Sequence, residues 1–288
     1  MNWKKGIGIV AVLAVLGFVA YSIFGRETEP QAESVRTGEA TEEAITETVL
    51  LSGLIEPQET QELMGQGIVS EVNAAVGEDV AEDDALVTYV DGTILRANMD
   101  GTVTEVNVSE DEPDMNAQSG QPSIVVADLD NLQVAVSVSK SDSELIEEDQ
   151  SVELTYGEDV YDGTVSHIDP VATTEQTPTG TTTAQQAVIN IDSEADNLVA
   201  GFDIDAEVIV ASKDDAIVIP LEALMYNENN EPYVFTVENG TAKQTPIQTG
   251  IQSNTHIEVT EGVSAGTTVI LSPNEAIEDG TAVTANQE

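Results

Sequence analysis

The chain has 288 residues, 40% of them apolar, so it is long enough to bury two or three hydrophobic cores. It carries 54 acidic and 8 basic side chains, a formal net charge of −46 at pH 7. Nucleic acid is excluded as a partner, because phosphate binding needs clustered lysine and arginine. Cysteine is absent from the sequence, which excludes disulfides, thiolate metal sites and cysteine nucleophiles.

The first 26 residues differ in character from the rest. They hold three basic side chains and no acid, and residues 6–24 form an uncharged, apolar run. As a helix, this run spans about 28 Å, which matches the hydrocarbon core of a bilayer. Lys4 and Lys5 precede it and favour a cytoplasmic amino terminus. The pattern predicts a single-pass cell-membrane protein with an extracytoplasmic body; a cleaved signal peptide is the alternative.

An all-β pattern follows a polar segment. Residues 27–46 are rich in Glu, Thr, Ala and Gln and show little apolar periodicity, which predicts an acidic, solvated tether. Beyond them, short runs of Val, Ile, Leu and Thr alternate with polar residues, as in 132–138 and 206–210. One short helix is expected at 141–148, with Ser141 as its N-cap.

An internal repeat adds to this pattern. The hexapeptide GIVSEV at 67–72 recurs as GTVTEV at 101–106, with four identical positions. The recurrence predicts a pseudo-symmetric pair of sheets. The positions that define the two half-motifs are Gly67, Val69, Val72, Gly77 and Val80, followed by Ile94, Ala97, Gly101, Val103 and Val106.

These half-motifs resemble the barrel-sandwich hybrid of the membrane fusion proteins, the HlyD-like and RND-type periplasmic adaptor subunits of bacterial efflux systems. The resemblance continues through 128–136, through 198–208 with Gly201, and through 216–224 with Pro220. It covers about residues 46–285 in the family's order.

The resemblance implies a mainly β protein in which an N-terminal transmembrane helix precedes three β domains. The expected parts are a membrane anchor at 1–26, an acidic tether at 27–46, a lipoyl-like barrel-sandwich hybrid with its leading strand at 47–131, a β-barrel at 132–213 and a membrane-proximal β domain at 214–288. The leading strand at 47–53 is expected to return to the last domain.

The sequence departs from the family pattern at two points. Many members insert a long α-helical hairpin between the half-motifs, whereas here only 87–93 separates them, so we expect a tight turn at Asp91-Gly92. The second departure is a charge of −49 beyond residue 26, which is interpreted as adaptation to high salt or high pH. Lipoyl and biotinyl carriers share the sandwich, but the only basic residue between Arg36 and Lys140 is Arg96, so no acceptor lysine exists.

No catalytic or metal-binding pattern emerges. The sequence has neither a P-loop nor a G-x-S-x-G elbow. His167, two positions before Asp169, and His256 are both predicted to be surface histidines without a catalytic role. The acidic run 109–114 lacks the ligand spacing of an EF-hand loop. We therefore predict no catalytic residue, cofactor or resident metal.

Two loops are also expected from composition. Residues 227–231 are rich in Asn and Glu and predict the turn of a hairpin. Residues 173–183 are rich in threonine and predict a mobile loop within the barrel, which could contact a partner.

The function implied by the resemblance is that of a non-catalytic adaptor in an export complex. Such a protein would assemble, as a homo-oligomeric ring, on the outer face of a membrane permease. The favoured partner is an ABC-type exporter with its ATPase, and a proton-driven permease comes second. The alternatives are a membrane-anchored surface protein that binds cell-wall polymer or another extracellular ligand, and an extracytoplasmic cation-binding or hydrolytic protein.

Overall fold

The computed structural model describes residues 32–177, 180–195 and 197–286. The expected membrane anchor lies outside these residues and stays a prediction. Within the described ranges, no helix has both the length and the apolar character needed to cross a membrane. The described chain consists mainly of β-strands, so the predicted fold class is confirmed in this respect.

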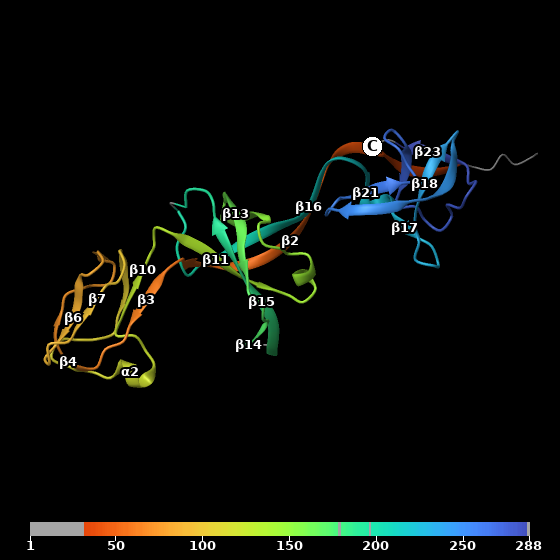
Figure 1. Ribbon diagram of the computed structural model, residues 1–288. Coiled ribbons are helices and arrows are strands. Elements are labelled where there is room, and N and C mark those ends of the chain that lie inside the picture. The colour runs from red at the N-terminus through yellow and green to blue at the C-terminus, as the bar shows by residue number, and fades with distance from the viewer. Residues whose placement is uncertain (1–31, 178–179, 196, 287–288) are drawn as a thin grey trace, which may run out of the picture. The chain divides into compact units, whose positions relative to one another are not determined.

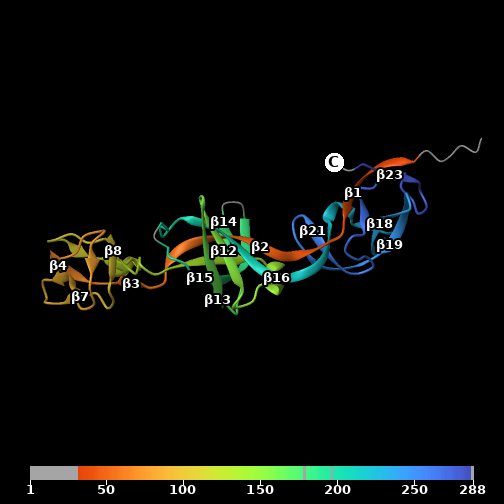
Figure 2. The same ribbon diagram turned by 90° about the horizontal axis from the view of Figure 1, so that it is seen from above.

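The chain forms two compact units (Figures 1 and 2). The C-terminal unit consists of the described residues up to 45 together with those from 213, and the second unit, called here the 46–212 unit, consists of the residues between them. Two long strands, β2 (Thr41–Pro57) and β16 (Asp203–Pro220), begin in one unit and end in the other.

Two four-stranded sheets form one part of the 46–212 unit. Their orders are β3-β10-β8-β5 and β7-β6-β4-β9. The repeated hexapeptides are β4 and β8, which occupy the third place in their respective sheets, so the predicted pseudo-symmetric pair is confirmed. The elements are β3 (Thr60–Leu63), β4 (Gly67–Val72), β5 (Asp79–Val80), β6 (Ala85–Tyr89), β7 (Ile94–Arg96), β8 (Gly101–Val106), β9 (Pro113–Asp114), α2 (Asn116–Ser119) and β10 (Ile124–Ala127).

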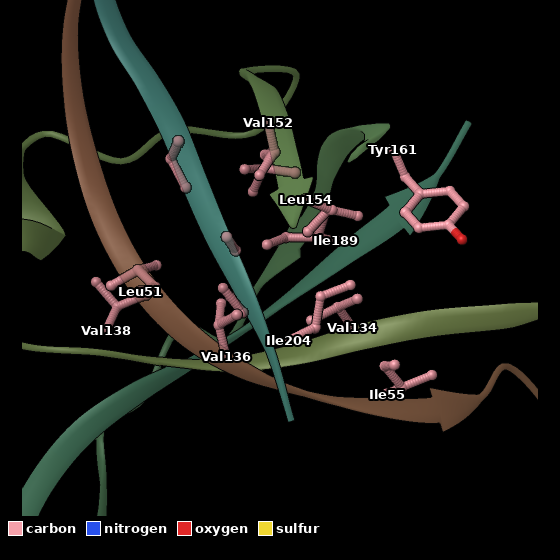
Figure 3. Packing of buried hydrophobic residues seen from close by; sticks show 14 of the residues in the cluster. Leu51, Ile55, Val134, Val136, Val138, Val152, Leu154, Tyr161, Ile189 and Ile204 are labelled. Atoms are coloured by element: carbon pink, nitrogen blue, oxygen red, sulfur yellow. The ribbon is translucent and has the colours of Figure 1, made fainter. Parts of the chain in front are cut away.

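A closed barrel forms the other part of the 46–212 unit. The strand order is β12-β13-β15-β11-β2-β16, and β12 pairs back onto β16, which removes the open edges. Alternate residues of each strand point inward. Ile55, Leu154 and Ile189 are completely buried in this core (Figure 3). The remaining elements are β11 (Leu132–Val138), the 3₁₀ helix η1 (Asp142–Glu144), β12 (Ser151–Tyr156), β13 (Asp159–Ile168), β14 (Thr173–Thr177) and β15 (Gly180–Ile191).

The C-terminal unit is built around a sheet of order β17-β18-β22-β1-β23, with β19 paired to β18. The end of β16 pairs with β21, and β21 pairs with β20. The elements are β1 (Glu33–Glu39), the 3₁₀ helix η2 (Leu221–Ala223), β17 (Met225–Tyr226), β18 (Pro232–Glu238), β19 (Thr241–Pro246), β20 (Gln248–Gln252), β21 (His256–Glu261), β22 (Thr268–Leu271) and β23 (Val283–Asn286).

The predicted tether is wrong from residue 33 onward. Strand β1 pairs antiparallel with β22 and parallel with β23, and β2 begins at Thr41. Val35, Ala40 and Ile45 are buried, but they stand five positions apart, so neither helical nor strand periodicity is visible. The prediction that the leading strand at 47–53 returns to the last domain is wrong. That strand belongs to the 46–212 unit, and residues 33–45 join the C-terminal unit.

Two local predictions are also corrected. The helix expected at 141–148 is the single turn η1, where Ser141 makes no capping bond and the Ser139 hydroxyl donates to Asp142 at 2.6 Å. The loop expected at 173–183 contains strand β14, which pairs with β15. Threonine-rich strands without alternating apolar residues carry no periodic signal, although β-branched side chains favour extended backbone.

The predicted hairpin turn at 227–231 is confirmed. Met225 pairs with Tyr233 across it, and the Asn227 side-chain oxygen accepts hydrogen bonds from the backbone N–H groups of Asn229 and Glu231, both at 2.9 Å. This is the local bonding by which asparagine stabilises turns.

Candidate functional site

The half-motif residues form cores and turns. Val69, Val103 and Ala97 are buried in the sandwich core. Val72, Val80 and Val106 pack against that core while partly exposed, whereas Ile94 is exposed on β7. These positions therefore explain the fold.

The glycines and the proline of the motifs occupy tight places in different parts of the chain. Gly77 has a φ of +85°, which favours glycine in its turn. A Cβ atom on Gly101 would lie 2.7 Å from the Ala127 carbonyl oxygen, so only glycine lets β8 approach β10 this closely. The Gly201 N–H donates to the Ile55 carbonyl in the 46–212 unit, and Pro220 pairs with His256 in the C-terminal unit. The motif residues thus converge on no single site.

A tight turn closes the β6–β7 hairpin, between the two half-motifs. The Tyr89 N–H donates to the Thr93 carbonyl at 2.8 Å, and the Gly92 N–H donates to the Tyr89 carbonyl at 2.9 Å. The Asp91 carboxylate accepts the Thr93 N–H at 2.9 Å, and this bond holds the pKa of Asp91 below its usual range. The predicted turn is confirmed, and this protein has no helical hairpin at that place.

Tyr89, at which this turn begins, also belongs to a buried polar cluster. The Asp114 carboxylate is 4% exposed and accepts the Tyr89 hydroxyl at 2.5 Å and the Ser123 hydroxyl at 2.6 Å, both at Oδ2. Its Oδ1 accepts the Asn116 N–H at 3.0 Å, and the Ser123 Oγ accepts the Gly65 N–H at 2.9 Å. Burial, followed by the bond to Asp114, raises the pKa of Tyr89. The cluster ties three chain segments together.

Sequence reasoning missed this cluster. In the sequence, Asp114 is only the end of an acidic run, in which Glu110, Glu112 and their neighbours face solvent. Nothing local distinguishes the one carboxylate that turns inward, because its two hydroxyl donors come from residues 25 positions earlier and 9 positions later.

The two histidines behave as surface residues. His167 is exposed, with Nδ1 3.3 Å from Glu148 and Nε2 3.5 Å from Asp169, so the predicted neighbourhood of Asp169 is confirmed. His256 is half-buried, and its Nδ1 lies 2.9 Å from the Thr255 hydroxyl. Neither histidine lines either of the two hollows described below.

Acidic side chains gather around a hollow of about 540 Å³ in the 46–212 unit. Asp79, Asp100, Asp128 and Asp130 line it. Three of them already accept local bonds: Asp79 from the Thr102 hydroxyl, Asp100 from the Glu82 N–H and Asp128 from two backbone N–H groups. Across the described ranges, no group of three or more His, Asp and Glu side chains is placed to hold a metal ion.

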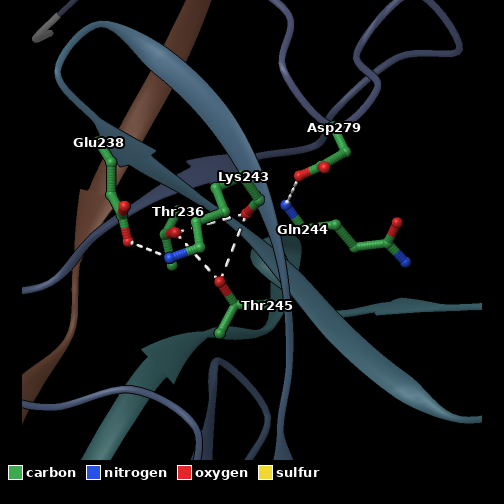
Figure 4. A network of polar contacts seen from close by, with 6 residues as sticks. All are labelled: Thr236, Glu238, Lys243, Gln244, Thr245 and Asp279. Atoms are coloured by element: carbon green, nitrogen blue, oxygen red, sulfur yellow. Dashed lines mark hydrogen bonds and ion pairs between the residues drawn. The ribbon is translucent and has the colours of Figure 1, made fainter.

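A second hollow, of about 480 Å³, lies in the C-terminal unit between β18, β19 and the segment 262–268. Its lining contains a single acidic residue, Glu238, which is few for so acidic a chain. The Glu238 carboxylate is bonded to Lys243 Nζ at 2.8 Å (Figure 4). That bond raises the pKa of Lys243. The buried Thr236 hydroxyl lies 3.1 Å from that of Thr245, so the floor is polar and internally bonded. We call this hollow the C-terminal groove.

Both the sequence and the fold of this chain match known proteins. Residues 216–285 match the family of the YknX C-terminal permuted SH3-like domain. MacA from Actinobacillus actinomycetemcomitans has the same fold, with a TM-score of 0.70 and 16% identity, over 82% of this chain and 99% of that chain. The predicted resemblance to the membrane fusion proteins is confirmed.

Two further solved structures are among the matches. A MacA–MexA chimera that contains the Pseudomonas aeruginosa MexA α-hairpin domain matches with a TM-score of 0.61 and 15% identity, over 81% of this chain and 98% of that chain. The membrane fusion protein Spr0693 from Streptococcus pneumoniae R6 is 19% identical over 57% of this chain and 99% of its own, with a TM-score of 0.47. No curated protein matches the sequence. The chain is thus similar to membrane fusion proteins but, within its described residues, has a tight turn in place of the helical hairpin.

Proposed function

We propose that this protein is a non-catalytic adaptor of an export complex, assembled on the outer face of a membrane permease. The observation that carries the proposal is the match to MacA over 99% of that chain and 82% of this one. A match of this extent includes parts of both described units, and residues 216–285 independently match the YknX domain family by sequence.

The chemistry of the described residues supports a passive role. The buried carboxylates Asp114 and Glu258 are both hydrogen-bonded, and no buried side-chain nitrogen or oxygen in the described ranges lacks a partner. Enzyme sites commonly keep polar groups aimed at a bound substrate. Here the polar groups bond one another, as expected of a scaffold.

The expected domain division is part of this proposal. The expected parts are a barrel-sandwich hybrid at 47–131, a β-barrel at 132–213 and a membrane-proximal domain at 214–288. Separate sets of buried residues support the three parts, but Leu51 and Ile55 of the leading strand pack in the barrel core, so we place the start of the sandwich after β2. The apolar run at 6–24 would serve as a single-pass anchor with the amino terminus in the cytoplasm. Residues 33–45 would then lead from the anchor directly into the membrane-proximal domain.

The tight turn at Asp91-Gly92 restricts what the adaptor reaches. Without a helical hairpin, the β6–β7 end of the sandwich has no coiled coil with which to dock onto an outer-membrane duct. We therefore propose that the complex serves a single membrane. An ABC-type exporter with its ATPase is the favoured partner, and a proton-driven permease comes second. The C-terminal groove, with its balanced charge, is the surface we assign to the permease.

The test is a mild-detergent purification of the tagged full-length protein from its own membranes, with co-purifying proteins identified by mass spectrometry. The untagged strain is the control for background. Recovery of a permease, and loss of export of its substrate when the adaptor is deleted, would support the proposal. Recovery of the protein alone, with export unchanged, would overturn it and favour the anchored surface protein that binds wall polymer.

A further inference from the structure

Strand β14 and the first residues of β15 form a two-stranded ribbon that extends away from the body of the barrel (Figure 1). The pairs run from Thr173 with Ala184 to Thr177 with Gly180. Strand β13 pairs with β15 only from residue 187 onward, and β11 pairs with it only from residue 185 onward. Among the described residues, therefore, no strand pairs with the outer edge of β14 or with the outer edge of β15 over 180–184. We call these two edges the ribbon edges.

The register shows which backbone groups the ribbon edges present. Two residues separate Thr177 from Gly180, so that pair is hydrogen-bonded, and bonded and non-bonded pairs then alternate. Thr174 pairs with Thr183 at a non-bonded position, and their hydroxyl oxygens are 3.2 Å apart, as this closer type of pair allows. The N–H and C=O groups of Thr174, Gln176, Thr181 and Thr183 accordingly point outward.

Natural proteins usually protect such edges with lysine, proline or dense charge. The segment 170–187 has one acid and no base, in a chain with 54 acids. When two copies of this protein meet, surfaces rich in carboxylates repel one another, whereas the ribbon, with a single acid, causes little such repulsion. Strand addition along an open edge is a common mode of protein association.

We propose that the ribbon is the contact between adjacent copies of this chain, with β14 of one copy paired to residues 180–184 of the next. This head-to-tail pairing joins Thr174 to Thr183 and Gln176 to Thr181 of the neighbour, which brings the outward groups of both edges into register. Two different edges that pair head to tail generate a closed ring or a filament. The inference therefore rests on the homo-oligomeric ring that the family resemblance implies for the proposed adaptor.

Charge disfavours the symmetric pairing of β14 with β14 of a second copy. If β14 paired antiparallel with β14 of a second copy over its whole length, Glu175 would lie opposite Glu175 of that copy. Like charges directly opposite one another destabilise a strand pair. In the head-to-tail register, position 175 is paired with position 182 of the neighbour, so no two acidic positions of the ribbon are paired.

Two proline variants of the full-length protein in mild detergent test the proposal. Thr174→Pro removes an outward N–H from β14, and Thr181→Pro removes one from β15, whereas the bonded pairs within the ribbon stay intact. Thr174→Val and Thr181→Val keep the N–H and serve as matched controls. Sedimentation velocity should show that each proline variant self-associates on the order of tenfold more weakly than the wild type, and that both valine variants behave as wild type.

Mixing the two proline variants provides the decisive measurement. Each retains the edge that the other lacks, so the mixture should form a dimer and no larger species, which also shows that both variants are folded. Association of the wild type should strengthen as salt rises from about 0.1 M to about 1 M, because the remaining surfaces repel one another less.

The outcomes separate this inference from the proposed function. Loss of self-association with the permease still bound supports the ribbon contact. Self-association that survives both proline substitutions overturns it, as does a wild type that stays monomeric beside its permease; the adaptor proposal then stands. If the proline variants self-associate normally but lose the permease, the ribbon faces the permease and the inference is wrong. If the ribbon controls self-association and no permease is ever recovered, the proposed function fails instead.

Discussion

Removing the Tyr89 hydroxyl should loosen the sandwich core measurably. Tyr89 is 1% exposed, and its hydroxyl is one of three donors to the buried Asp114 carboxylate. Tyr89→Phe keeps the buried ring and removes one hydrogen bond to a charged acceptor, which is worth about 1.5–3 kcal/mol. At about 2 kcal/mol, the opening equilibrium rises roughly 30-fold.

Ser123→Ala should cost more, about 2–4 kcal/mol, because the Ser123 hydroxyl both donates to Asp114 and accepts the Gly65 N–H. Its loss would leave a backbone N–H without its partner beside the carboxylate. The two variants affect the same group, so their effects should not add, and a double-mutant cycle should show coupling.

Hydrogen exchange followed by mass spectrometry measures these changes in the full-length protein. Peptides that cover 65–72 and 107–123 should exchange faster in both variants, while peptides of β11 in the barrel should not change. Tyr226→Phe is the matched control, since Tyr226 is 53% exposed on β17. Exchange of the 107–123 peptides within about twofold of wild type in Tyr89→Phe would refute the view that the buried cluster holds this segment.

Three further outcomes are expected. The folded-state pKa of Tyr89 is raised above 10.0, so the contribution of Tyr89 to stability is complete below about pH 10 and is lost as pH rises toward the raised value. Hydrogen exchange in the sandwich should therefore accelerate above about pH 10, and Tyr89→Phe should abolish that acceleration. The pKa of Glu258 is lowered, first by Lys213 and then by the Ile251 N–H, so the contribution of Glu258 to stability is present above about pH 4.5 and is lost as pH falls. Lys213→Met should flatten this pH dependence and lower the free energy of unfolding by about 1–3 kcal/mol at neutral pH, as measured by hydrogen exchange in β21. Ile55→Ala should destabilise the barrel by about 2–5 kcal/mol, because Ile55 is completely buried, and a thermal transition unchanged by this substitution would contradict the assigned core.

The polar side chains show where sequence patterns stop being informative. Strict alternation along β21 predicts that His256 faces solvent while Ile257 and Val259 are buried, yet Glu258 is buried as well. Its partners are Lys213, which is 45 positions away, and the Ile251 N–H. A period-two pattern describes which face a residue takes, but it contains nothing about a distant base that lets a carboxylate be buried.

Local features of this protein follow from the sequence alone. Alternating runs determine most strands, Asp91-Gly92 and Asn227 determine their turns, and the repeat at 67–72 and 101–106 determines the paired sheets, because each depends on backbone preferences of neighbouring residues. Only the tertiary structure decided the rest. Strand β1 is held by pairing with β22, in which Arg36 lies opposite Leu271. The buried Asp114 carboxylate is stabilised by hydroxyl donors from two other segments. Long-range strand pairing and polar burial depend on which segments meet in space, and no local pattern records that meeting.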